Sequence, residues 1–128
     1  IGVGHLGQAI LNYPGFAPEG FDVVAAFDSD PEQEGGTFAG LTVQPMSALR
    51  EVMQGRGIQI GVVAVPASQA QSVIDHLVSA GVRAILNYAP VAPRVPAGVF
   101  VRNIDPVLSL QSLTFYLLRD VEGSSPGP

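Results

Sequence analysis

Short apolar runs alternate with amphipathic segments along most of the chain, and this alternation limits the folds open to it. Continuous apolar runs of a few residues are typical of parallel strands that are buried on both faces. The clearest runs are 23–27, 61–65, 84–86 and 99–101, with a weaker one at 41–43. Segments with helical spacing lie at 6–13, 47–54 and 68–80. Ser68 is a possible N-cap of the last of these, and Gly81 a stop signal. The pattern predicts an α/β fold with a mostly parallel, doubly wound sheet.

Three glycines near the start of the chain have the spacing G-x-G-x-x-G, at Gly2, Gly4 and Gly7. In a strand-to-helix turn the first glycine permits the tight bend, and the second lets a pyrophosphate approach the backbone. The third lets the helix pack closely on the strand, and the free N–H groups of the first helical turn favour the anion. We therefore expect a dinucleotide to contact this turn at Gly2, Gly4, His5, Leu6 and Gly7. His5 either hydrogen-bonds the pyrophosphate or faces solvent.

The glycine motif begins at the second residue, immediately after Ile1. In a doubly wound sheet the strand that leads into such a turn is central. We therefore expect most of that first strand to lie upstream of Ile1 in the full protein.

An acid follows the glycine motif at the distance expected for a ribose ligand. Asp28 ends the second apolar run, 21 residues after Gly7. A carboxylate there accepts hydrogen bonds from the adenosine 2′-hydroxyl and repels a 2′-phosphate. Acidic side chains follow Asp28 closely, the nearest being Asp30, and no arginine lies among them. The combination predicts a Rossmann-like domain that binds NAD(H) in preference to NADP(H) or coenzyme A. In the alternative interpretation Asp28 and Asp30 only form the turn before Pro31.

Two further loops leave the carboxyl ends of predicted strands, where open α/β sheets bind ligands. In the first, Val65 and Pro66 are the expected contacts. The second carries Asn87, Tyr88, Ala89 and Pro90. The amide of Asn87 suits a carboxamide, and Tyr88 suits the flat face of a nicotinamide ring. Alternatively, Asn87 hydrogen-bonds its own loop.

Composition excludes several other functions. The chain has no cysteine and a net charge of −5, and its six basic residues are all arginines without a cluster. Because binding to nucleic acid depends on basic side chains that neutralise phosphates, this chain is not expected to bind DNA by itself. No apolar run approaches the roughly 20 residues that span a bilayer, so no membrane partner and, by default, a cytoplasmic location are expected.

We find no set of residues that predicts catalysis or a metal site. The two histidines are His5 and His76; His76 lies beside Asp75 in the middle of a predicted helix and is interpreted as solvated. No His–Asp pair, Tyr–Lys pair or group of metal ligands accompanies the predicted nicotinamide end. The sequence therefore predicts no catalytic residue, no metal and no enzymatic activity.

The last helical segment, 107–118, is apolar on most of its sides. Asp105 is placed to cap it, and Pro106 to occupy its first turn. A helix that is apolar all round must be buried all round. We expect it to pack against a second subunit; the alternative is a groove in its own domain. The predicted organisation is a nucleotide-binding domain over 1–104, a dimerisation helix over 105–119 and a flexible tail over 120–128.

With these residues considered together, residues 1–118 resemble the C-terminal domain of the redox-sensing transcriptional repressors called Rex. The resemblance depends on the glycine motif with Leu11-Asn12-Tyr13 after it, on the segments 25–31 and 65–67, on the long block 80–91, and on Asn103-Ile104-Asp105. The block 80–91 is the most specific of these.

The resemblance implies an N-terminal winged-helix domain that is absent from this chain, and a homodimer whose C-terminal helices cross between subunits. It implies that NAD⁺ favours operator binding and that NADH releases the DNA. Tyr13 would lie beside the nicotinamide, and Asp105 at the interface whose pairing differs between the two states. His5, Tyr88 and Pro106 depart from residues common in the family.

Two alternatives belong to other classes. One is the cofactor-binding half of an NAD-dependent oxidoreductase, against which the missing acid or base and the missing substrate domain count. The other is a coenzyme A-binding module of an acyl-CoA ligase. That module requires positive charge for the ribose phosphate and a suitably placed histidine, and the sequence shows neither.

Overall fold

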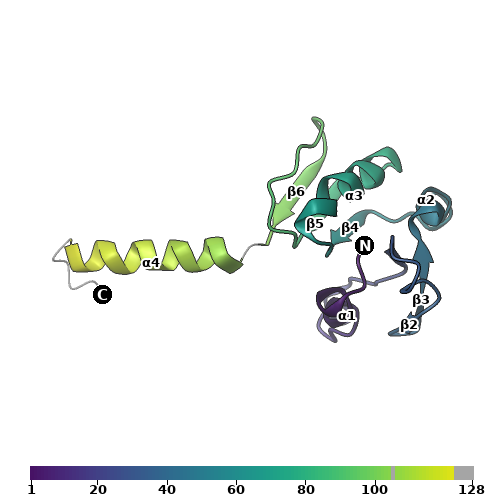
Figure 1. Cartoon of the computed structure of the whole chain (residues 1–128), viewed down its shortest axis with the longest axis horizontal. Coiled ribbons are helices and arrows are strands. Elements are labelled where there is room, and N and C mark those ends of the chain that lie inside the picture. The colour runs from purple at the N-terminus through teal and green to yellow at the C-terminus, as the bar shows by residue number, and fades with distance from the viewer. Residues whose placement is uncertain (105, 123–128) are drawn as a thin grey trace.

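The computed structural model describes residues 1–104 and 106–122, and for residues 107–109, 121 and 122 it describes the backbone alone. Figure 1 shows the order of the elements along the chain. The helices are α1 (His5–Leu11), α2 (Leu49–Arg56), α3 (Ala67–Ser79) and α4 (Pro106–Glu122), with 3-10 turns at Ala17–Glu19 and Met46–Ala48. The strands are β1 (Ala26–Asp28), β2 (Thr37–Phe38), β3 (Leu41–Pro45), β4 (Ile60–Val63), β5 (Ala84–Asn87) and β6 (Phe100–Asn103).

Residues Ile1 and Gly2 join two small sheets into one arrangement. β1 pairs with β3 in parallel and β2 pairs with β3 antiparallel, while β4, β5 and β6 form a parallel sheet. Between the sheets, the Gly2 N–H donates to the Phe27 carbonyl at 2.9 Å, and the Ala64 N–H donates to the Ile1 carbonyl at 2.8 Å. With Ile1–Gly2 counted as the first strand, the parallel strands follow the order of a dinucleotide-binding sheet. The predicted α/β, Rossmann-like fold is confirmed.

The core lies on both faces of this sheet. On one face, Phe27, Val63 and Ile85 pack with side chains of α2 and α3. On the other face, Val3, Ala26 and Val43 pack with Leu11 of α1. Neighbouring residues of a strand point to opposite faces, so Ala26 and Phe27 serve one cluster each. Helices α2 and α3 therefore lie on one face of the sheet, and α1 lies on the other face beside Val3, Ala26 and Val43.

Several predicted boundaries are wrong by two or three residues. β1 begins at Ala26 instead of residue 23, because β3 pairs with it only over 26–28 and Gly2 reaches only Phe27. α3 begins at Ala67 with Pro66 as its N-cap, so Ser68 is not the cap. The stop at Gly81 is confirmed: its φ is +97°, and the N–H groups of Gly81 and Val82 donate to carbonyls of the last turn of α3.

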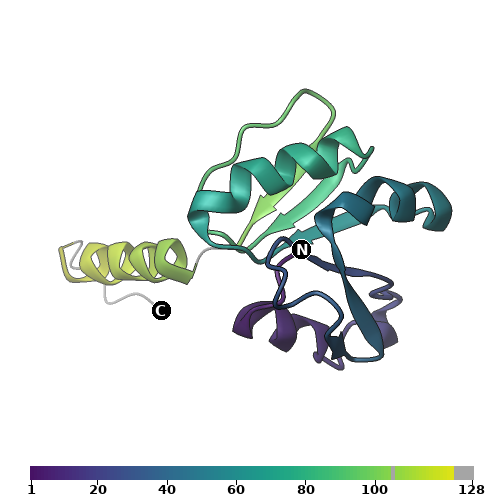
Figure 2. The same ribbon diagram turned by 45° about the vertical axis from the view of Figure 1, so that its right-hand side comes forward.

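Helix α4 extends away from the sheet (Figures 1 and 2), so the alternative in which it lies in a groove of its own domain is wrong. It starts at Pro106, as predicted, and runs to Glu122, three residues beyond the predicted end at 119. Its large apolar side chains that the structure describes are exposed, at Leu110, Leu113, Phe115, Tyr116, Leu117 and Leu118. Asp105 and residues 123–128 lie outside the described residues. None of the described helices is both long and apolar enough to cross a membrane.

Candidate functional site

The predicted contact residues gather at one edge of the sheet, where the parallel strands end. β1 ends at Asp28, β4 leads into Val65 and Pro66, and β5 ends at Asn87. The glycine turn leaves the same edge from Ile1–Gly2, between β1 and β4. The topology therefore brings together segments that are up to 86 residues apart, from Gly4 to Pro90.

The three glycines of the turn have different physical requirements. A Cβ on Gly2 would meet the Ala64 carbonyl oxygen at 2.5 Å, and the φ of Gly2 is +96°. A Cβ on Gly7 would collide with the carbonyl of Gly2. A Cβ on Gly4, in contrast, meets no atom of the described chain within 4 Å, and Gly4 is exposed. Packing within the protein therefore explains two of the glycines and leaves Gly4 facing open space.

Asp28 joins the end of β1 to the glycine turn. Its Oδ2 accepts a hydrogen bond from the Val3 N–H at 2.8 Å, and its Oδ1 accepts one from the Asp30 N–H at 2.9 Å. Each carboxylate oxygen has a second lone pair, so the half-buried side chain retains acceptor capacity. Asp30 is exposed and accepts from the Glu32 N–H at 3.0 Å, which is the turn-forming role of the alternative interpretation.

The residue before the glycine turn is held between the two sheets. The Ile1 nitrogen donates to the Val62 carbonyl at 2.6 Å, and the Ile1 carbonyl accepts from the Ala64 N–H at 2.8 Å. These hydrogen bonds fix the start of the turn beside Asp28.

The polar groups of the Asn87 side chain are hydrogen-bonded within the protein. Its side chain is fully buried, and its Oδ1 accepts from the Ala89 N–H at 3.0 Å. Its Nδ2 lies 3.1 Å from the Ala89 carbonyl, 3.3 Å from the Val91 carbonyl and 3.0 Å from the Oδ1 of Asn103. Of the two interpretations of Asn87, the one in which it hydrogen-bonds its own loop is the one that the structure shows.

The remaining predicted residues differ in how exposed they are. His5 and Leu6 are exposed at the start of α1, and Pro66 and Pro90 are exposed in their loops, where Ala89 is buried and Tyr88 half-buried. Tyr13 is 57% exposed beyond the far end of α1, with its ring edge-on to Phe16 at 4.9 Å. In the described residues no hydrogen bond or aromatic contact joins Tyr13 to the other predicted residues.

Sequence reasoning missed several residues that shape this edge. The Gln8 side chain donates to the Val3 carbonyl at 3.0 Å, inside the turn. The Gln71 side chain holds the backbone of Arg94, donating to its carbonyl at 2.9 Å and accepting from its N–H at 2.8 Å. Asn103, the last residue of β6, is also missed as a site residue, although its position at the end of an apolar run could have placed it beside Asn87.

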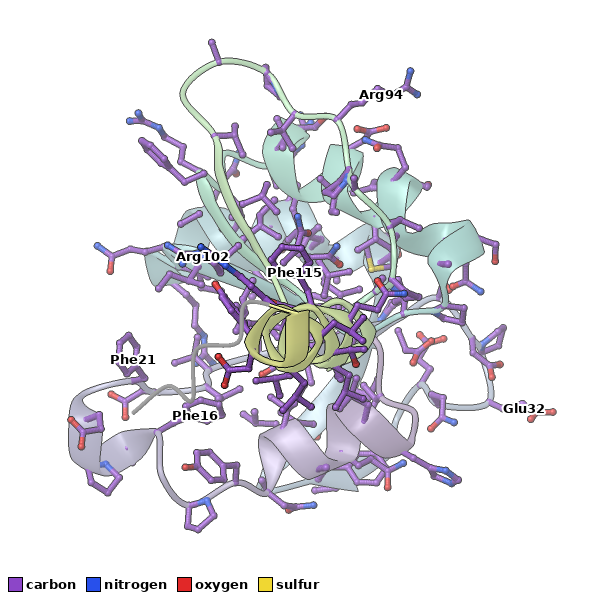
Figure 3. All side chains as sticks on the ribbon, turned by 90° about the vertical axis from the view of Figure 1, so that its left-hand side faces the viewer. Phe16, Phe21, Glu32, Arg94, Arg102 and Phe115 are labelled. Atoms are coloured by element: carbon purple, nitrogen blue, oxygen red, sulfur yellow. The ribbon has the colours of Figure 1, made fainter. Side chains whose placement is uncertain are left out.

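A large apolar hollow of about 1040 Å³ lies elsewhere. Of the predicted site residues only Gly2 and Gly7 line it; its walls include Phe16, Phe21, Ile60 and Phe100. In β4–β6 the residues Ile60, Ala84 and Phe100 are in register and lie on the face opposite α3. Figure 3 shows Phe16 and Phe21 on the same side of the molecule as Arg102 of β6.

A parallel sheet in this order, a glycine turn and an acid at the neighbouring strand define a nucleotide-binding domain of the doubly wound class. A family model described as "CoA binding domain" matches residues 1–91, and the chain belongs to this family.

Its relatives are Rex repressors. The redox-sensing transcriptional repressor Rex of Chloroflexus aurantiacus is 51% identical over 122 residues, which are 95% of this chain. The crystal structure of RSP, a Rex-family repressor, in complex with beta-NADH matches with a TM-score of 0.83 and 34% identity over 94% of this chain. RSP in complex with beta-NAD⁺ and operator DNA matches with a TM-score of 0.84 and 31% identity over 97% of the chain. The predicted resemblance to Rex is confirmed. The chain spans 58–59% of the length of each of these proteins.

Proposed function

We propose that this chain is the NAD(H)-binding, redox-sensing domain of a Rex-type transcriptional repressor. In this proposal the full protein binds operator DNA through a separate domain, and NADH binding to residues 2–7, Asp28 and the loops at 65–66 and 87–90 releases it. A cytoplasmic location and the absence of catalysis are parts of the same proposal. They agree with relatives that are named as repressors.

The observation that carries the proposal is the hydrogen bond that joins Asp28 to the glycine turn. The 2.8 Å hydrogen bond from Val3 to Asp28 sets the carboxylate beside Gly4, whose outward side is open. A carboxylate in that position suits the ribose hydroxyls of NAD(H) and repels the 2′-phosphate of NADP(H). The similarity to the NADH and NAD⁺ complexes of RSP supports the same ligand.

The family description also makes coenzyme A a second candidate ligand. Coenzyme A carries a phosphate on its ribose, and the segment after Asp28 contributes Asp30, Glu32 and Glu34, all acidic. Repulsion between these carboxylates and the phosphate disfavours coenzyme A. The two candidates separate cleanly in a binding experiment.

Calorimetric titration of the chain with NADH, NAD⁺, NADPH and coenzyme A tests the proposal. We expect NADH to bind more tightly than NAD⁺, and NADPH and coenzyme A to bind at least tenfold more weakly than NADH. Asp28→Ala should weaken NADH by about 1–3 kcal/mol, the cost of leaving polar partners unpaired. Asp30→Ala is the matched control and should change NADH affinity by less than about twofold if Asp30 only forms the turn. Equal affinity for NADH and NADPH, or tight binding of coenzyme A alone, would contradict the proposal.

The arrangement of the apolar surfaces supports a homodimer. Helix α4 exposes its apolar side chains, and the hollow exposes Phe100 by 70% and Ile60 by 47% on the face of the sheet opposite α3. Each large apolar side chain left in water costs about 1.5–3 kcal/mol. We infer that α4 of a second copy enters this hollow and covers both surfaces at once. In a twofold dimer the exchange is reciprocal, so both hollows are filled.

A further inference from the structure

The side-chain amide of Asn87 has more acceptors than protons. Its Nδ2 carries two protons, while three acceptors surround it: the carbonyls of Ala89 and Val91 and the Oδ1 of Asn103. The distances, 3.0–3.3 Å, are all within hydrogen-bond range. Asn87 itself is fully buried, whereas Asn103 is exposed and Val91 half-buried. The loop and the end of β6 therefore compete for the same two protons.

The loop is held at its far end as well. Gln71 of α3 makes a pair of hydrogen bonds to the backbone of Arg94, at 2.8 and 2.9 Å. Near its start, the Val91 N–H donates to the Ala89 carbonyl at 2.8 Å. Tyr88 and Pro90 therefore lie in a loop whose backbone is hydrogen-bonded to side chains at both ends, to Asn87 and to Gln71.

On its other side, Asn87 contacts the segment that leads into α4 in two ways. Its amide reaches the Oδ1 of Asn103, the last residue of β6, and its backbone carbonyl accepts from the Ile104 N–H at 2.8 Å. Helix α4 begins two residues after Ile104, at Pro106. Asn87 is therefore hydrogen-bonded to both Asn103 and Ile104, close in sequence to the start of α4.

We propose that Asn87 and Asn103 form a proton-sharing link between the ligand loop and α4, and that Asn103 is a positioning residue for the redox response. When the loop binds a ligand, the hydrogen bonds from Asn87 to the loop carbonyls strengthen or weaken. The hydrogen bond from Asn87 to Asn103 then changes in the opposite sense. This difference biases the direction in which α4 leaves the sheet, which is the kind of differential contact that coupling between two sites requires. The identity of the ligand rests on the proposed function; the sharing of protons does not.

Removal of the Asn103 acceptor should tighten the loop, which is the opposite of the usual effect of losing a hydrogen bond. In Asn103→Ala, two protons serve two acceptors, so the loop should become tighter. Amide hydrogen exchange followed by NMR in the absence of ligand should slow about two- to tenfold at Ala89 and Val91, the range that one neutral hydrogen bond supplies. Asn103→Asp keeps the acceptor and adds charge, so it should draw the proton away and accelerate the same amides. Asn12→Ala, the same truncation at the C-cap of α1, is the control and should change neither. Faster or unchanged exchange in Asn103→Ala would overturn the link.

A second measurement connects the link to the ligand. In the unmodified chain, saturating NADH should change the exchange of the Ile104 amide and of the first turns of α4. In Asn103→Ala this change should disappear, while calorimetric affinity for NADH stays within about threefold, since the variant loses coupling and not contacts. A variant that keeps the full NADH-dependent change would overturn the inference. If the unmodified chain binds no NADH, the proposed function fails, and the ligand-free exchange still decides whether the protons are shared.

Discussion

At the scale of single residues, the glycines of the turn differ in whether packing within the protein requires them. Gly7 is required by packing, because a methyl group there would strike the carbonyl of Gly2. Gly4 is not, because its φ of −75° suits any residue and no atom of the described chain lies within 4 Å of its missing Cβ. The remaining reason for a glycine is the close approach of something outside the chain.

Substitution of these two glycines should therefore affect different quantities. Gly4→Ala should leave the free energy of unfolding unchanged or raise it by about 0.4–1 kcal/mol, since alanine restricts the unfolded chain. The same variant should bind NADH at least tenfold more weakly. Gly7→Ala should lower the free energy of unfolding by about 1–3 kcal/mol or more, as overpacking does. Thermal unfolding and calorimetry measure both quantities. NADH binding to Gly4→Ala at full affinity would show that Gly4 does not contact the ligand.

At the scale of elements, α4 differs from α2 and α3 because none of its described side chains is buried. α2 and α3 bury Leu49, Met53, Ile74 and Leu77, whereas α4 exposes its apolar side chains. An isolated helix of 17 residues is marginal in water unless its apolar surface is covered. Its stability should therefore depend on association.

Leu113→Asp tests this dependence. Leu113 is 59% exposed in the single chain and, in the proposed dimer, becomes buried. Because the substitution occurs twice in a twofold dimer, it should cost about 3 kcal/mol or more and raise the dissociation constant at least about 100-fold. Ser112→Asp introduces the same charge at a neighbouring exposed position and should leave the dimer intact. Sedimentation equilibrium of the three proteins decides the question. A monomeric unmodified chain, or Leu113→Asp dimers of equal stability, would contradict this role of α4.

At the scale of the whole molecule, the charge distribution predicts that this chain alone does not bind DNA. The net charge is −5, and the six exposed arginines are spread over the chain, two of them on α2. Three of them, Arg50, Arg56 and Arg83, donate hydrogen bonds to backbone carbonyls of their own domain.

We expect fluorescence anisotropy of a labelled duplex to show no saturable binding below about 100 μM chain at physiological salt, weaker than ordinary non-specific binding. Repetition at low salt is the control, because it strengthens any attraction to phosphates. Micromolar binding at physiological salt would show a DNA-contacting surface that the charge distribution does not reveal. It would also remove the need for a separate DNA-binding domain.

The sequence by itself determined the fold class, the glycine turn, the acid at the end of the following strand and the apolar character of α4. These features are local: spacing along the chain and side-chain chemistry are sufficient to specify them. Only the tertiary structure decided the role of Asn87, because its three acceptors come from Ala89, Val91 and the distant Asn103. The same holds for the distinction between Gly4 and Gly7, and for the start of β1 at Ala26. Each depends on which atoms of other segments lie nearby, and spacing along one chain carries no such information.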